Sequence, residues 1–185
     1  MRHDSLKRTI LATALFSLSA APLALFAAGD PNVTISHSDK SFVEKAAQGG
    51  VAEVQLGKLA AQKAQSPEVK KFGERMEKDH ASANQKLTTL ASQKGLAAAT
   101  EMDSSSKREY DKLSKLSGAE FDKEYMKAMV SDHKKDIKEF QSEAKSGKDA
   151  DIKNFAQSTL PTLEDHLKQA ESAEADTKNE KTASK

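Results

Sequence analysis

The chain has 185 residues, 29 Lys and Arg against 28 Asp and Glu, and no cysteine. This length allows one domain of ordinary size with extra segments at its ends. Because basic and acidic residues are interleaved and nearly cancel, the composition argues against a nucleic-acid-binding surface and a polybasic membrane patch. The absence of cysteine excludes disulfides, thiolate chemistry and zinc sites built on cysteine.

The first 28 residues are typical of a secretory signal peptide. Basic residues precede an apolar stretch rich in Ala and Leu, and we expect cleavage near Ala27 or Ala28. An uncleaved membrane anchor is the alternative that stays open, because the stretch approaches the length of a spanning helix. Cleavage would leave 26 basic and 27 acidic residues, and we expect residues 29–40 to form a linker in the exported protein.

Two long helices are predicted next. Apolar residues recur every three or four positions, and Ala, Lys, Glu, Gln and Leu dominate while β-branched residues are sparse. The first helix is predicted over residues 41–65. The second opens where Ser66 can cap the helix and Pro67 suits its first position, and it ends near Gly95.

A long connection, residues 96–117, separates this pair from a second pair of helices. A short helix is expected around residues 107–116 within the connection. Ser117 and Glu120 then have the spacing of a capping box, which predicts the start of the third long helix. That helix stops at "KSGKD", residues 145–149.

The last long helix is predicted over residues 149–173, with a kink at Pro161, where the backbone lacks an amide hydrogen. Residues 174–185 are polar, and we expect a disordered tail. Two hairpins joined by a long crossover predict an all-α fold, a four-helix bundle over residues 41–173.

Each predicted helix places one metal-ligating side chain on its buried stripe: Glu53, His80, His133 and His166 lie three, four or seven residues from apolar neighbours that face inward. Counting the rise per residue from the hairpins brings Glu53, His80 and His133 to a similar height. The same count offsets His166 by roughly 5–8 Å, which a kink at Pro161 could reduce.

Such a set has the chemistry of a transition-metal site. Neutral imidazole suits zinc, copper and iron, and a carboxylate offsets the charge of the cation. Asp79, Asp132 and Asp165 each precede one of the histidines and could orient the ligands or add to them. Buried methionines on the same helices would favour copper(I) if their sulfur atoms pointed inward.

A metal-free interpretation explains the same pattern. An internal ion pair between Glu53 and His80 or His133 would form a buried polar contact that sets the register of the helices. Methionine at helical spacing is commonly core filler. Both interpretations stay open at the level of the sequence, which contains no glycine-rich phosphate loop, no pattern for nucleophilic catalysis and no paired inner carboxylates.

The segments "EVQLGKLA" (53–60), "MEKDH" (76–80), "FDKEYMKAMVSDH" (121–133) and "LEDHL" (163–167) resemble the DUF4142 family of exported bacterial proteins. The resemblance spans about residues 40–172. It implies a ferritin-like four-helix fold and a periplasmic or outer-membrane-associated location, and it leaves the biochemical role undefined.

Ferritin-like di-iron sites use a Glu from each of two helices and a Glu-x-x-His from each of the other two. Glu77 and His80 satisfy one such motif, but Leu163 stands three residues before His166, so a di-iron oxidase site is not expected. We therefore predict a non-enzymatic envelope protein that binds one zinc, copper or iron ion. The rival hypotheses are a metal-free envelope interaction or stress-response protein with a protein partner, and an oxidoreductase with a redox metal.

Overall fold

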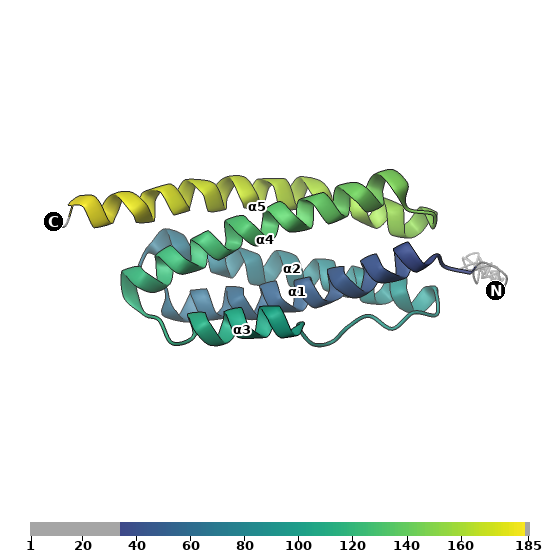
Figure 1. Ribbon diagram of the computed structural model, residues 1–185, viewed down its shortest axis with the longest axis horizontal. Coiled ribbons are helices and arrows are strands. Elements are labelled where there is room, and N and C mark those ends of the chain that lie inside the picture. Colours follow the sequence, from purple (N-terminus) through teal and green to yellow (C-terminus); the bar gives the residue numbers. More distant parts are fainter. Residues whose placement is uncertain (1–33, 184–185) are drawn as a thin grey trace, which may run out of the picture.

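The computed structural model describes residues 34–183, which form five helices and no strand (Figure 1). Two antiparallel hairpins lie against each other, and a short helix in the crossover runs along the first hairpin (Figure 1). The helices are α1 (His37–Lys63), α2 (Pro67–Gln93), α3 (Ser104–Leu113), α4 (Gly118–Ser146) and α5 (Ala150–Ala183). The all-α prediction of a ferritin-like bundle of two hairpins is confirmed.

The observed starts of the helices agree in part with those predicted from the sequence. Ser66 accepts a hydrogen bond from the amide of Glu68, and Pro67 occupies the first turn of α2, as predicted. Helix α1 begins at His37 under a cap from Ser36, so the last residues of the expected linker are helical. The capping box at the start of α4 is wrong, because Ser117 makes no side-chain hydrogen bond to the helix.

Helix α5 continues to Ala183, ten residues past the predicted end of the last helix at Ala173. The structure thus has helix over 174–183, where the sequence predicted a disordered tail, and this part of α5 runs beyond the other helices (Figure 1). Six of the ten residues in this segment are Ala, Glu or Lys, which favour helix, and no Gly or Pro interrupts it. Pro161 lies inside α5 and does not end it. The predicted signal peptide, residues 1–28, lies outside the described residues.

The two hairpins are tied together by two buried carboxylates in a reciprocal arrangement. Asp39, at the start of α1, accepts hydrogen bonds from the amides of Lys148 and Asp149 in the α4–α5 turn, at 3.1 and 2.8 Å. Asp122, at the start of α4, accepts from the amides of Gln65 and Ser66 in the α1–α2 turn, at 3.0 and 2.7 Å. Each hairpin therefore supplies partners for backbone groups at the turn of the other.

The apolar core consists of two clusters at different heights along the bundle. One contains Leu56, Phe72, Met76, Tyr125 and Met129 among others, and the second contains Val43, Leu87, Ile137, Ile152 and Leu163. On every long helix the residue predicted to bind metal falls between the stretches that build the two clusters. A buried polar layer thus separates two apolar halves of the core.

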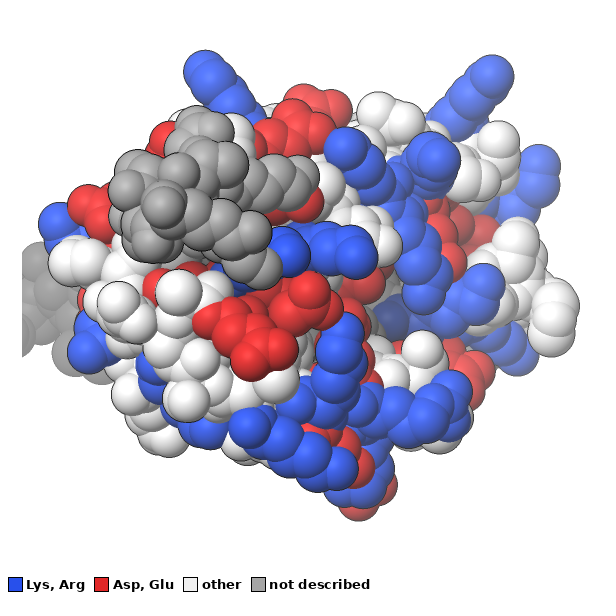
Figure 2. Space-filling view, turned by 60° about the vertical axis from the view of Figure 1, so that its left-hand side comes forward, with Lys and Arg blue, Asp and Glu red and all other residues white. Residues whose placement is uncertain are grey.

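The surface carries both signs of charge. On the face drawn in Figure 2, Lys and Arg side chains stand beside Asp and Glu side chains. Among the described helices, none is both long enough and apolar enough to cross a membrane.

Candidate metal centre

Three imidazole rings from three helices meet in the polar layer. His80 comes from α2, His133 from α4 and His166 from α5. The ring centroids lie 5.3 to 5.7 Å apart, and one nitrogen of each ring lies within 4.8 Å of the corresponding nitrogens of the other two. His133 and His166 are fully buried, and His80 is 6% exposed. Both hairpins therefore contribute to one cluster, the histidine triad.

Each ring has one buried nitrogen without a hydrogen-bond partner. These nitrogens are His80 Nε2, His133 Nε2 and His166 Nδ1. The outer nitrogens of two rings are engaged: His133 Nδ1 donates to the carbonyl of Met129 at 2.9 Å, and His166 Nε2 donates to Asp79 Oδ2 at 3.0 Å. These bonds fix the tautomers of His133 and His166 that leave a lone pair on His133 Nε2 and His166 Nδ1, the arrangement that metal-ligating histidines use.

The electrostatics of the triad favour neutral rings. Burial lowers the pKa of all three imidazoles, and it brings the pKa of His133 to about 4. Repulsion between the rings adds to this effect, because a proton on one ring disfavours a proton on the next. For His166, the hydrogen bond to Asp79 opposes the effect of burial without cancelling it. At neutral pH the rings therefore present lone pairs rather than charges.

Asp79 orients His166 and is itself held by Arg75. The guanidinium of Arg75 donates to Asp79 at 3.1 Å and to Asp165 at 2.7 Å, so it connects α2 to α5. Although burial acts in the opposite direction, the hydrogen bonds from His166 and Arg75 lower the pKa of Asp79 and keep it ionised. The sequence suggested Asp79 as a supporting residue, but its histidine partner lies on the other hairpin. Arg75 was missed, although its spacing of four residues from Asp79 was a usable signal.

Glu53 lies beside the triad rather than within it. Its Oε1 is 3.9 Å from His133 Nδ1, the nitrogen that already donates to Met129. Glu53 is 2% exposed, and its Oε2 has no hydrogen-bond partner. Burial raises the pKa of Glu53 well above its usual value, and the negative charges of Asp136, Asp132 and Glu109 raise it further.

His166 belongs to the cluster, whereas the count of helical rise offset it from the other three residues. That count treats the helices as parallel rods that start level at each hairpin, and tilt or stagger of the helices changes the relative heights. Glu77, the Glu of the one di-iron-like motif, faces Lys58 at 3.9 Å with 41% of its side chain exposed. It therefore points away from the triad.

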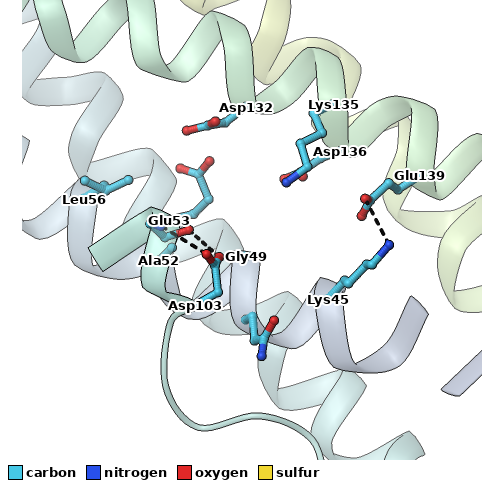
Figure 3. A pocket seen from close by; sticks show the side chains of 12 residues that line it. Lys45, Gly49, Ala52, Glu53, Leu56, Asp103, Asp132, Lys135, Asp136 and Glu139 are labelled. Atoms are coloured by element: carbon cyan, nitrogen blue, oxygen red, sulfur yellow. Dashed lines mark hydrogen bonds and ion pairs between the residues drawn. The ribbon is translucent and has the colours of Figure 1, made fainter. Parts of the chain in front are cut away.

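A cavity of about 250 Å³ adjoins Glu53 between α1, α3 and α4 (Figure 3). Its walls include the carboxyl groups of Glu53, Asp132 and Asp136. Burial raises the pKa of Asp132 to about 7 and that of Asp136 to about 6, with a contribution from Glu109 at Asp132 and from Glu139 at Asp136. The sequence suggested Asp132 as a supporting residue or additional ligand of the histidines, and it did not single out Asp136.

Comparison with solved structures reveals the same fold in other proteins. A DUF305 fragment from Deinococcus radiodurans superposes with a TM-score of 0.68 at 11% identity, covering 77% of this chain and 99% of that one. A DUF305 protein from Streptomyces coelicolor gives 0.66 at 13% identity, covering 76% and 93%. CopM in its Cu(I)-bound form gives 0.61 at 20% identity, covering 72% and 93%, and its Cu(II)-bound form is also similar.

Comparison with sequences gives the family. No curated protein matches the chain. The model of the domain of unknown function DUF4142 matches residues 22–173, which include helices α1 to α4, most of α5 and every residue of the polar layer. The chain therefore belongs to the DUF4142 family.

Proposed function

We propose that this protein binds a transition metal ion through His80, His133 and His166, in a non-enzymatic role in the cell envelope. The observation that carries the proposal is the meeting of three buried imidazoles, each with one ring nitrogen that has no hydrogen-bond partner. Buried polar atoms are nearly always hydrogen-bonded, so three unpaired nitrogens at one point call for a ligand. A cation shared by the three lone pairs satisfies all of them at once.

The donor set indicates the kind of ion. Three neutral imidazoles suit copper or zinc, and a site with three protein ligands leaves a position open for water or another ligand. The copper-bound forms of CopM, which has the same fold, support copper as the first ion to test. Iron is a weaker candidate, because di-iron sites of this fold need carboxylate ligands that the triad lacks. Glu53 would offset part of the cation's charge from beside His133.

Export is part of the proposal. The first 28 residues have the composition of a signal peptide, so we propose that the mature bundle works in the periplasm or at the outer membrane. Sequencing the N-terminus of the protein recovered from the periplasm tests this. A first residue close to position 28 supports export with cleavage, and recovery of the intact chain from the cytoplasm contradicts it.

Elemental analysis of the untagged protein, purified from the periplasm, tests the metal site. We expect close to one metal ion per chain in the wild type and in His37→Ala, which removes an exposed histidine at the start of α1. His80→Ala and His133→Ala should each lose most of the metal. Equal metal content in all four proteins would overturn the proposal and favour the metal-free alternative, in which the polar layer only sets the register of the helices.

A further inference from the structure

The cavity beside Glu53 has the features of a second site. It lies between α1, α3 and α4 and has a volume of about 250 Å³, enough for an ion with several water molecules (Figure 3). Carboxyl groups from two of these helices line it: Glu53 from α1, and Asp132 and Asp136 from α4. Glu109 on α3 is not part of the lining, but its charge acts on both Glu53 and Asp132.

Glu53 is the strongest sign that this cavity takes a ligand. The residue is 2% exposed, and one of its carboxyl oxygens, Oε2, has no hydrogen-bond partner. Figure 3 shows the side chain reaching toward Asp132 across the cavity. A buried carboxyl without a partner is costly, so its position next to two further acids is unfavourable for the protein alone.

The basic residues around the cavity compensate these acids only in part. Lys135 lines the cavity and acts on Asp132 and Asp136. Lys45 is engaged by Glu139 at 3.8 Å (Figure 3). Asp103 is also engaged, since it accepts hydrogen bonds from the backbone and side chain of Ser106 and caps α3. The carboxyl groups of Glu53, Asp132 and Asp136 therefore outnumber the basic groups that face them.

We propose that this cavity binds a hard divalent cation through the carboxylate oxygens of Glu53, Asp132 and Asp136. Oxygen donors select Mg²⁺, Mn²⁺ and Ca²⁺, whereas the imidazoles of the triad select softer ions. Among the described residues, the triad is the group whose ligand atoms all lie within 4.8 Å. The carboxylates are spaced more widely, so water molecules complete the shell of the ion, as is common for Mg²⁺ and Mn²⁺.

The proposal does not depend on a metal at the triad, and Mn²⁺ is the probe that tests it. The electron paramagnetic resonance signal of free Mn²⁺ is lost on binding, so titration of the metal-free, full exported chain at pH 8 gives stoichiometry and affinity. The double variant Asp132→Asn/Asp136→Asn removes two carboxylates of the cavity. The matched control Glu74→Gln/Glu120→Gln removes two exposed carboxylates elsewhere.

We expect one Mn²⁺ per chain in the wild type, the control and His80→Ala/His133→Ala. The affinity should fall at least about tenfold in Asp132→Asn/Asp136→Asn, because the affinity of an oxygen-ligand site follows the number of its charged ligands. Glu53→Gln should weaken binding in the same direction. Circular dichroism and thermal melting of each variant verify that the fold is retained, and Glu53→Gln alone tests the site if the double variant unfolds.

Two results would overturn the second site directly: no Mn²⁺ binding by the wild type, or equal Mn²⁺ affinity in the wild type and both cavity variants. Loss of Mn²⁺ binding in His80→Ala/His133→Ala would also overturn it, because that result would place Mn²⁺ at the triad. Competition of the same proteins with a chromophoric chelator for Zn²⁺ measures the triad separately. Failure of one site therefore leaves the other measurable.

Discussion

Asp79 holds the ring of His166 by a hydrogen bond to Nε2 at 3.0 Å, although the two residues belong to different hairpins. A carboxylate in this position fixes the tautomer and raises the basicity of the inner nitrogen. Asp79→Ala should therefore weaken Zn²⁺ or Cu²⁺ binding by about 10- to 100-fold, as removal of such partners does in other metal sites. Competition with a chromophoric chelator measures this change.

Asp165→Ala is the matched control for Asp79→Ala. Asp165 binds the same guanidinium of Arg75 at 2.7 Å and is half exposed. We expect its removal to change metal affinity by less than about threefold, because exposed ion pairs contribute little. Equal losses in the two variants would indicate that Arg75, rather than the contact with His166, supports the site.

Asp136 should destabilise the metal-free fold at neutral pH. Burial, followed by the negative charge of Glu139, raises its pKa from 3.8 to about 6. The folded state then holds the proton to higher pH than the unfolded state, so stability is lost as the pH rises through about 6. Asp136→Asn should be stabilising, by about 1–2 kcal/mol more at pH 8 than at pH 4.5.

Urea unfolding of Asp136→Asn and the wild type at both pH values measures this difference. The histidine triad titrates in the opposite sense, since burial lowers the pKa of His133 to about 4 and the fold loses stability toward acid pH. That contribution is common to both proteins and cancels in the comparison. Glu74→Gln, which replaces an exposed acid, should change the free energy of unfolding by the same small amount at both pH values. An equal gain in stability for Asp136→Asn at pH 4.5 and pH 8 would contradict the raised pKa.

At the scale of the helices, Asp122 connects the start of α4 to the α1–α2 turn. Its carboxylate accepts two backbone amide hydrogens and is 3% exposed. Asp122→Ala leaves both amides without a partner and should lower the free energy of unfolding by about 2–4 kcal/mol. Glu120→Ala, two residues earlier and exposed, should change it by less than about 0.5 kcal/mol. Similar midpoints of urea unfolding for the two variants would contradict the role of Asp122.

Glycines set the close approach of α1 and α2. A Cβ at Gly57 would lie 2.7 Å from the carbonyl oxygen of Gly73 and 2.7 Å from the amide of Glu77, both backbone atoms that cannot move alone. Gly57→Ala should therefore destabilise the bundle by about 1–3 kcal/mol. Gly49→Ala in the same helix meets no atom closer than 3.9 Å and should stabilise it by about 0.5–1 kcal/mol. Thermal melts measure both variants, and melting temperatures of Gly57→Ala and Gly49→Ala that shift in the same direction would contradict this packing.

At the scale of the whole molecule, a metal at the triad would join the two hairpins. His80 belongs to the first hairpin, and His133 and His166 belong to the second. Because the unfolded chain does not hold the three rings together, metal at 100 times its dissociation constant should stabilise the fold by about 2.7 kcal/mol. Calorimetry should show a higher melting temperature with metal, reversal by a chelator, and no response in His133→Ala. A response unchanged in that variant would place the stabilising ion elsewhere.

The sequence by itself determined the helices and what each contributes to the core. Local periodicity, caps and the absence of breakers are properties of single helices, so residue spacing alone assigns Glu53, His80, His133 and His166 to inward stripes. The same local reasoning was wrong at two helix ends. Ser117 does not cap α4, and α5 continues to Ala183.

Only the tertiary structure decided which of these side chains meet. The tilt and stagger of the helices bring His166 level with His80 and His133, and they leave Glu53 beside the ring of His133 at 3.9 Å. Asp79 binds a histidine from the other hairpin, and the carboxyls of Asp132 and Asp136 face a cavity. Contacts between helices depend on their relative placement and on side-chain rotamers, which the spacing of residues within one helix does not specify.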